Sequence, residues 1–180
     1  MFTTDRLIAD CRRALHAGAT GEEVRRIAEL AVSDPAAVAR ALGASSRAGL
    51  FPLHQSAELT ILNVVWAPGM SIFPHDHRMW AVIAVYEGQE ANTFFARTAG
   101  GLVPAGKKVL NAGDAVLLDA RTVHAVTNPL ATFTAALQIY GGDFFGVARS
   151  EFDPETLAER PFEIERAKAV FLEANKGLAG

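Results

Sequence analysis

Residues 69–77 read Gly-Met-Ser-Ile-Phe-Pro-His-Asp-His, so two histidines stand two positions apart at the end of a mostly apolar run. Side chains alternate between the two faces of a β-strand, and His75 and His77 are therefore expected to share one face while Asp76 points to the other. Two imidazoles arranged in this way can reach one divalent ion at about 2.0–2.2 Å. A histidine on a strand is more often structural, so the metal interpretation depends on a further ligand.

A second stretch, residues 113–124, supplies that ligand. It reads GDAVLLDARTVH, which is a Gly-Asp turn, an apolar strand and a final histidine, His124. Such a turn and strand can carry His124 to a position opposite the first pair. We therefore predict that His75, His77 and His124 bind one divalent metal ion.

The pattern of residues 57–141 predicts a β-barrel. Short runs rich in Val, Ile, Leu and Phe are separated by Gly, Pro and Asn, which is typical of strands joined by turns. About seven such strands with no helices between them favour a sandwich or barrel over a parallel α/β sheet. The expected strands are ELTILNVVW, HRMWAVIAVYEG, ANTFFART, KKVLN, DAVLLD, HAVTN and FTAALQIYGG.

Helices are expected before and after the barrel. Residues 1–50 show helical spacing of apolar side chains and a capping box that begins at Thr20. Residues 150–177 return to this spacing, with Asp153-Pro154 interpreted as an N-cap followed by proline at the first helical position. We interpret the whole chain, residues 1–180, as one domain with both helical segments packed outside the barrel.

Composition excludes several classes of protein. The 180 residues carry a net charge of −3, whereas nucleic-acid-binding proteins normally present a basic face. No apolar segment is long enough to span a membrane, and the first ten residues lack the pattern of a secretory signal. The single cysteine, Cys11, cannot form an intramolecular disulfide. We therefore expect a cytoplasmic protein with neither nucleic-acid nor membrane partners, and the edges of its apolar strands suggest a homodimer.

At these positions the chain resembles the cupin superfamily. The resemblance implies a mainly β fold, the double-stranded β-helix or jelly-roll barrel, with the N- and C-terminal helices outside it. Residues 69–88 are similar to the first cupin motif and residues 113–128 to the second. The matching residues are Gly69, His75, His77 and Gly88 in the first motif, and Gly113, His124 and Asn128 in the second.

The first motif lacks its usual glutamate, because Ala81 and Val82 occupy that position. A site with three histidines and no carboxylate resembles the cysteine dioxygenase, or thiol dioxygenase, branch. That resemblance implies Fe(II), although imidazole also suits Zn and Ni, and Mn is a further alternative. Tyr140 falls where the branch has a tyrosine near the iron and is the candidate catalytic residue. Residues 74–95 look more similar still to bacterial proteins described only as predicted metal-dependent double-stranded β-helix proteins.

The chain departs from the thiol dioxygenase branch in its tyrosine relay. Serine and histidine of the branch are replaced by Ala136 and Gln138, so the relay to the tyrosine is broken. The branch also has an arginine that binds the substrate carboxylate, and Arg47 is the candidate by its position before the first strand. The candidate substrate pocket consists of Arg47, His54, Trp66 and Gln138.

The function implied by the resemblance is dioxygenation of a small thiol, or of a similar metal-chelating acid, by O₂. Tyr140 would donate a hydrogen bond to the bound ligand, or would be a core tyrosine with its hydroxyl satisfied. Two other functions stay open, because a fold does not fix a function. One is a metal-dependent isomerase or hydrolase, and the other is a non-catalytic protein that binds a metal or a small molecule.

Overall fold

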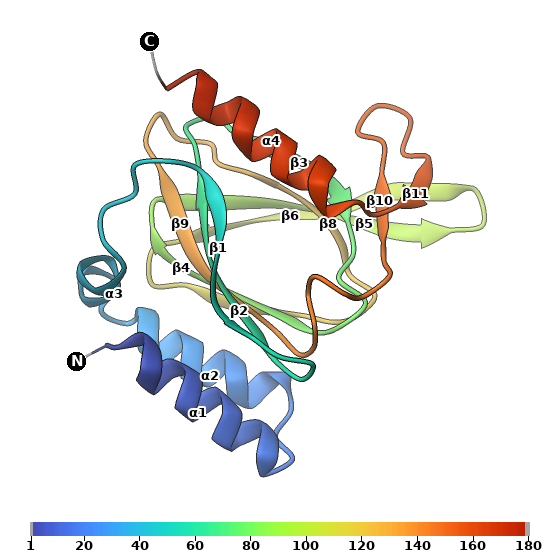
Figure 1. Cartoon of the computed structure of the whole chain (residues 1–180). Coiled ribbons are helices and arrows are strands. Elements are labelled where there is room, and N and C mark those ends of the chain that lie inside the picture. Colours follow the sequence, from blue (N-terminus) through green and yellow to red (C-terminus); the bar gives the residue numbers. More distant parts are fainter. Residues whose placement is uncertain (1, 179–180) are drawn as a thin grey trace.

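The computed structural model describes residues 2–178, and its centre is a pair of facing antiparallel sheets (Figure 1). The five-stranded sheet has the order β1-β2-β9-β4-β7, and the six-stranded sheet has the order β11-β10-β3-β8-β5-β6. Two antiparallel sheets closed face to face form the jelly-roll arrangement of cupins. The predicted fold class, mainly β with helices outside, is therefore confirmed.

The strands run along most of the chain. They are β1 (Gly49–Gln55), β2 (Thr60–Trp66), β3 (Ser71–His75), β4 (Ala81–Glu87), β5 (Gln89–Thr98), β6 (Gly101–Asn111), β7 (Ala115–Leu118), β8 (Val123–Thr127), β9 (Thr134–Tyr140), β10 (Ser150–Phe152) and β11 (Glu159–Pro161).

The strand β9 shows why the central strands of the five-stranded sheet are almost continuously apolar. All its residues are buried, because one face meets the barrel interior and the other meets helices. Ala136 and Tyr140 pack with the interior cluster, whereas Leu137 and Ile139 pack with the cluster beneath the helices. Gln138 shares the interior face by the same alternation.

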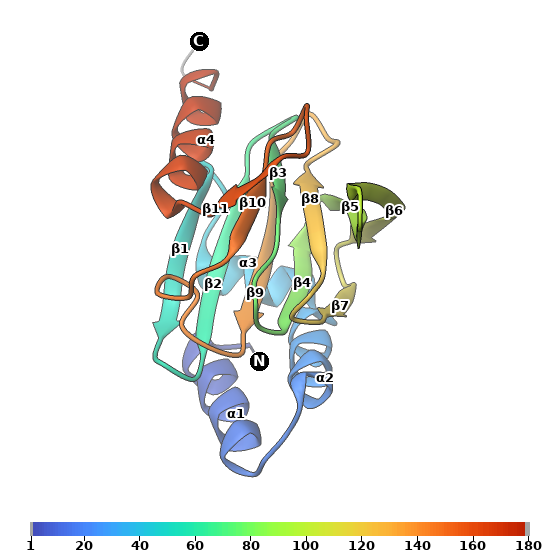
Figure 2. The same cartoon turned by 90° about the vertical axis from the view of Figure 1, so that its right-hand side faces the viewer.

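The helices cover two parts of the barrel surface. The helices α1 (Thr4–His16), α2 (Gly21–Val32) and α3 (Pro35–Leu42) pack on the outer face of the five-stranded sheet (Figure 1). The last helix, α4 (Ile164–Lys176), lies on the opposite side of the barrel, beside β1 (Figure 2). Its Phe171 ring lies 5.1 Å from the Trp66 ring, so α4 closes the barrel at the end of β2.

The first strand begins earlier than predicted. β1 starts at Gly49, within the segment assigned to helices and before the expected barrel start at residue 57. Proline at position 52 makes a strand here unexpected from the sequence, because proline has no N–H group to donate to a neighbouring strand. It is tolerated here because β1 is the edge of its sheet, where an unpaired position costs little.

The predicted helix start at Asp153-Pro154 is wrong. Residues 150–161 form a hairpin of β10 and β11 instead. The Asp153 carboxylate accepts hydrogen bonds from the N–H groups of Glu155 and Thr156, so the same local chemistry that caps a helix closes a turn here. The helix begins only at Ile164, and no helix among residues 2–178 is long and apolar enough to cross a bilayer.

Candidate metal centre

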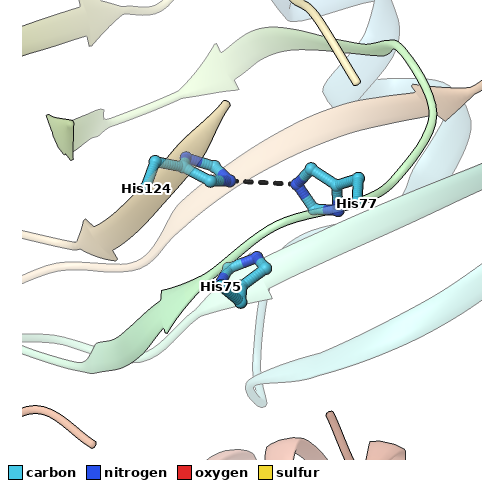
Figure 3. Close-up of side chains that lie close together, drawn as sticks. All are labelled: His75, His77 and His124. Atoms are coloured by element: carbon cyan, nitrogen blue, oxygen red, sulfur yellow. Dashed lines mark hydrogen bonds between the residues drawn. The ribbon is translucent and has the colours of Figure 1, made fainter. Parts of the chain in front are cut away.

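The three predicted metal-binding histidines converge at the interior of the barrel (Figure 3). His75 is the last residue of β3 and lies opposite His124 of β8 in the antiparallel register. His77 follows in the loop after β3, so only His75 of the pair is on the strand. The candidate ligand nitrogens of all three nevertheless lie within 4.8 Å of one another.

The spacing of the rings fits one metal ion. The Nε2 atoms of His77 and His124 are 3.0 Å apart. Two nitrogens that bind one ion at about 2.0–2.1 Å are separated by about 3.0–3.4 Å. The Nδ1 atom of His75 lies 3.0 Å from the carbonyl oxygen of Phe73. A carbonyl only accepts, so this ring donates from Nδ1 and keeps the Nε2 lone pair for a ligand bond.

Burial keeps the three imidazoles neutral. Desolvation lowers the pKa of His75 to about 4. The pKa values of His77 and His124 fall well below 6.5, first through desolvation and then through repulsion from the neighbouring histidines. Neutral rings offer lone pairs at pH 7, which is the state that a metal ligand needs.

Asp76 takes no part in this cluster. Its buried carboxylate lies 2.7 Å from Arg97 and 2.9 Å from Arg78, and accepts the N–H of Ser150. The alternation predicted for residues 75–77 therefore holds for the acid, which points away from the rings. Within the part of the chain that the structure describes, the metal-binding cluster consists of histidines alone.

A buried carboxylate that the sequence analysis missed lies behind the cluster. Glu90 of β5 is fully buried and accepts hydrogen bonds from Trp66 Nε1 at 3.1 Å, Asn92 Nδ2 at 3.2 Å and Gln138 Nε2 at 3.4 Å. The Asn92 Oδ1 atom in turn lies 2.7 Å from Nδ1 of His124. Burial raises the pKa of Glu90 to about 7. The only sequence signal was that Glu90 shares a strand face with Phe94.

The catalytic candidate Tyr140 lies beside the histidines. Its ring is 5.0 Å from the His77 ring, and its hydroxyl donates to the Oε1 atom of Gln138. Gln138 therefore takes the place of the missing relay as partner of the tyrosine. Burial raises the Tyr140 pKa, so the hydroxyl keeps its proton at neutral pH.

A cavity of about 20 Å³ adjoins the cluster, with Trp66, Gln138 and Tyr140 among its lining residues. This volume holds about one water molecule. Two of the four predicted pocket residues thus line it, and two do not. Arg47 is exposed and stacks over Phe51 at 5.3 Å.

The positions of Arg47 and His54, the two pocket candidates that do not line the cavity, have physical explanations. Phe51 packs in the layer between the five-stranded sheet and its helices, so Arg47 lies outside the barrel. His54 is half-buried on β1, beyond a register shift that follows Pro52. Leu50 is the residue of β1 that lines the cavity.

Arg149 is a second functional candidate that the sequence did not reveal. Its guanidinium is 4.2 Å from the Phe144 ring and 3.9 Å from the Phe162 ring. Arg149 is 6% exposed; Nη1 donates to the Phe144 carbonyl, while Nε and Nη2 have no partner among residues 2–178. Burial lowers the Arg149 pKa to about 10, so the group remains charged at neutral pH.

Arg149 lines an open groove of about 330 Å³ next to the cavity. Phe162 is among the residues that line both hollows. The positive charge of Arg149 also contributes to the low pKa values of His75 and His77, which shows that it lies within electrostatic range of the cluster.

No protein-family model matches the chain. Similar solved structures include a cupin superfamily protein from Desulfitobacterium hafniense, with a TM-score of 0.45 and 20% identity over 57% of this chain and 85% of that one. An rmlC-like cupin with a double-stranded β-helix fold from Methanocaldococcus jannaschii has a TM-score of 0.47 and 10% identity over 56% and 84%. An oxalate oxidase bound to glycolate has a TM-score of 0.44 and 16% identity over 52% and 50%. The double-stranded β-helix fold of this chain is evident from its strand order and strand register.

Proposed function

We propose that the chain is a mononuclear non-haem Fe(II) dioxygenase of cupin type that acts on a small thiol or a similar metal-chelating acid. One observation carries the proposal. Three neutral imidazoles, His75, His77 and His124, converge without a carboxylate beside the buried, partly unpaired guanidinium of Arg149.

The charge of the donor set favours an anionic ligand. Three neutral nitrogens leave a divalent ion with its full charge, and in a buried cavity that charge attracts a thiolate or carboxylate strongly. Fe(II), when bound, would supply the redox chemistry with O₂, whereas Zn, Ni or Mn would suit the same ligands.

Arg149 supplies the second point of attachment. Its free Nε and Nη2 groups form the edge of a guanidinium that binds a carboxylate through two parallel hydrogen bonds. A small thiol acid would satisfy both positive groups at once. Binding at two points would orient the ligand, and the apolar walls of Phe144 and Phe162 would exclude water.

The overall reaction balances without a further reductant. A thiol RSH and O₂ give the sulfinic acid RSO₂H, so both oxygen atoms enter the product and the sulfur loses four electrons. The neutral cluster and the protonated Tyr140 hydroxyl are compatible with this reaction at pH 7, because neither needs to gain or lose a proton for the ligand to bind.

An oxygen-electrode assay tests the proposal. The iron-loaded protein is supplied with thiol acids and with neutral thiols of the same length, and the product is analysed by mass spectrometry after reaction in ¹⁸O₂. We expect one O₂ consumed per thiol acid and two labelled oxygens in the product. Absence of uptake with every thiol, in protein that holds stoichiometric iron, would contradict the proposal.

A pair of arginine variants sharpens this test. Arg149→Met should raise KM for thiol acids by about 10–100-fold, the loss expected for a charged hydrogen-bonded pair, and should affect neutral thiols much less. Arg47→Met is the matched control, because Arg47 is exposed outside the barrel and its loss should leave both classes unchanged. Melting temperatures establish that both variants fold.

The size of the cavity favours a second candidate, a non-catalytic metal-binding protein. About 20 Å³ admits a water molecule but not a thiol acid, so catalysis requires side chains that line the cavity, such as Phe162, to move aside. Calorimetric titration of the metal-loaded protein with thiol acids separates the two candidates. Tight metal binding with no ligand binding would support the non-catalytic one.

A further inference from the structure

Glu90 connects the two sheets behind the cavity. It lies on β5 of the six-stranded sheet, while two of its three donors, Trp66 and Gln138, lie on β2 and β9 of the five-stranded sheet. The third donor, Asn92, is its neighbour on the same strand face. Both Glu90 oxygens are thus engaged, and the carboxylate has no contact with solvent.

We propose that Glu90 is a positioning residue that fixes the direction of hydrogen bonds on both sides of the cavity. Through Asn92 it makes His124 present Nε2 to the cluster, and through Gln138 it makes Tyr140 face the cavity as a hydrogen-bond acceptor. The role assigned to His124 rests on the metal site of the proposed function.

The first branch follows from the chemistry of each group. Above its pKa of about 7, Glu90 is an ionised carboxylate that only accepts, so Asn92 turns its amide nitrogen to Glu90 at 3.2 Å and its oxygen to His124 at 2.7 Å. The amide oxygen also only accepts, so His124 donates from Nδ1. Its Nε2 lone pair is then directed at the cluster, 3.0 Å from His77 Nε2. Outer partners of this kind orient a metal-binding histidine and select its tautomer.

The second branch reaches Tyr140. Gln138 donates from Nε2 to Glu90, which leaves Oε1 for the tyrosine hydroxyl. The hydroxyl has a single proton and donates it to Gln138, so its oxygen has only lone pairs for a cavity ligand. The ligand atom next to Tyr140 therefore carries a proton, as in a thiol, a hydroxyl or a water molecule. This direction is the reverse of the donor role expected from the sequence.

Glutamine at position 90 cannot support both branches, which makes Glu90→Gln the decisive variant. One of its terminal atoms donates and the other accepts, so it can accept a bond from Asn92 or from Gln138, but not from both. In this variant, either His124 changes tautomer or the Tyr140 hydroxyl changes from donor to acceptor in its hydrogen bond with Gln138. Glu87→Gln is the matched control, since Glu87 is the last residue of β4 and its carboxylate accepts a hydrogen bond from the Ser45 hydroxyl instead.

Two spectroscopic probes of the full-length, metal-free protein report these directions. Nitrogen-15 NMR of His124 distinguishes the Nδ1–H from the Nε2–H tautomer, with His124→Ala as the assignment standard. The infrared C–O stretch of Tyr140 distinguishes a donating from an accepting hydroxyl, in a Tyr86→Phe background because the chain has two tyrosines. At about pH 8.5, where Glu90 with its pKa of about 7 is ionised, we expect Nδ1–H and a donating hydroxyl in wild type and in Glu87→Gln, and a change in at least one probe in Glu90→Gln.

A change at His124 should also lower Zn²⁺ affinity by about 10–100-fold, as measured by competition with a chelator. Unchanged probes in a folded Glu90→Gln protein would overturn the proposal. If that variant does not fold, measurements on the wild type still test the proposal. An Nε2–H tautomer of His124 in the wild type, or a Tyr140 hydroxyl that does not donate, would by itself refute the role of Glu90. The two spectroscopic probes do not depend on enzyme activity. A protein that is inactive but shows the expected hydrogen-bond directions would therefore contradict the proposed dioxygenase activity and not the role of Glu90.

Discussion

Replacing Glu90 by glutamine should change how the stability of the protein depends on pH. Burial raises the pKa of Glu90 from 4.5 to about 7 in the folded protein. Below pH 4.5 the group is protonated in both the folded and the unfolded state. Between pH 4.5 and about 7 the folded protein holds a proton that the unfolded chain has released, so the free energy of unfolding falls as the pH rises.

The size of this effect follows from the pKa values. The interval between 4.5 and about 7 corresponds to roughly 3 kcal/mol at 1.36 kcal/mol per pKa unit. About 2.5 kcal/mol of it falls between pH 5 and pH 8. Glu90→Gln has no proton to exchange at this position, so its stability relative to wild type should rise by that amount across the same range. The hydrogen bonds lost in the variant add an offset that does not depend on pH.

Urea denaturation followed by circular dichroism measures the difference directly. Wild type, Glu90→Gln and the control Glu87→Gln are unfolded at half-unit steps from pH 5 to pH 8. Taking the difference from wild type removes the contribution of the buried histidines, which all three proteins share. Parallel stability curves for wild type and Glu90→Gln would refute the reasoning, because they would mean that Glu90 titrates alike in the folded and unfolded states.

Three further predictions follow from the geometry. His124→Ala should lower Zn²⁺ affinity by roughly 100-fold or more, as measured by calorimetry, while His16→Ala at the exposed end of α1 should leave it unchanged. Gly88→Ala should lower the free energy of unfolding by about 2–4 kcal/mol, because Gly88 has a φ of 70° and an added Cβ would lie 2.4 Å from Thr134 Oγ1; a loss below about 0.5 kcal/mol in urea would contradict this. Phe162→Ala removes a side chain that lines both groove and cavity and should make the cluster histidines of metal-free protein reactive to diethyl pyrocarbonate, whereas unchanged protection would show that other residues close the cavity.

The sequence predicted the part of the site whose geometry depends on one residue type, histidine, and on the spacing of that residue along the chain. The strand register brings His75 opposite His124, and short apolar runs with Gly-Asp turns are enough to predict strands that meet in this way. His77 was placed on the correct side, although it lies beyond the strand end. Local spacing therefore predicted which rings converge, because one strand pair brings His75 and His124 together and His77 follows only two residues after the end of β3.

The surroundings of the cluster could not be predicted, because they depend on contacts between distant segments. Glu90 sits in the run Gln-Glu-Ala-Asn-Thr, and only the more distant Phe94 on the same strand face indicates that the face with Glu90 and Asn92 is the buried one. Its other two donors come from β2 and β9. Arg149 is held by two phenylalanine rings that approach it from different segments, and no local pattern distinguishes it from a surface arginine.

Above the pKa of Glu90, about 7, two buried groups of opposite charge lie near the cavity, Glu90 and Arg149. They differ in how many of their polar atoms have hydrogen-bond partners, and this difference supports the proposal of an anionic ligand. The Glu90 carboxylate accepts three hydrogen bonds, so a ligand would find no free acceptor there. The Arg149 guanidinium keeps two N–H groups without a partner, and a buried donor without a partner costs about 1–3 kcal/mol. A cation would leave that cost in place and add repulsion, whereas a carboxylate would remove it. Within residues 2–178, the Glu90 carboxylate therefore has its hydrogen-bond partners, whereas two N–H groups of Arg149 do not, and this difference supports the anionic ligand that we propose.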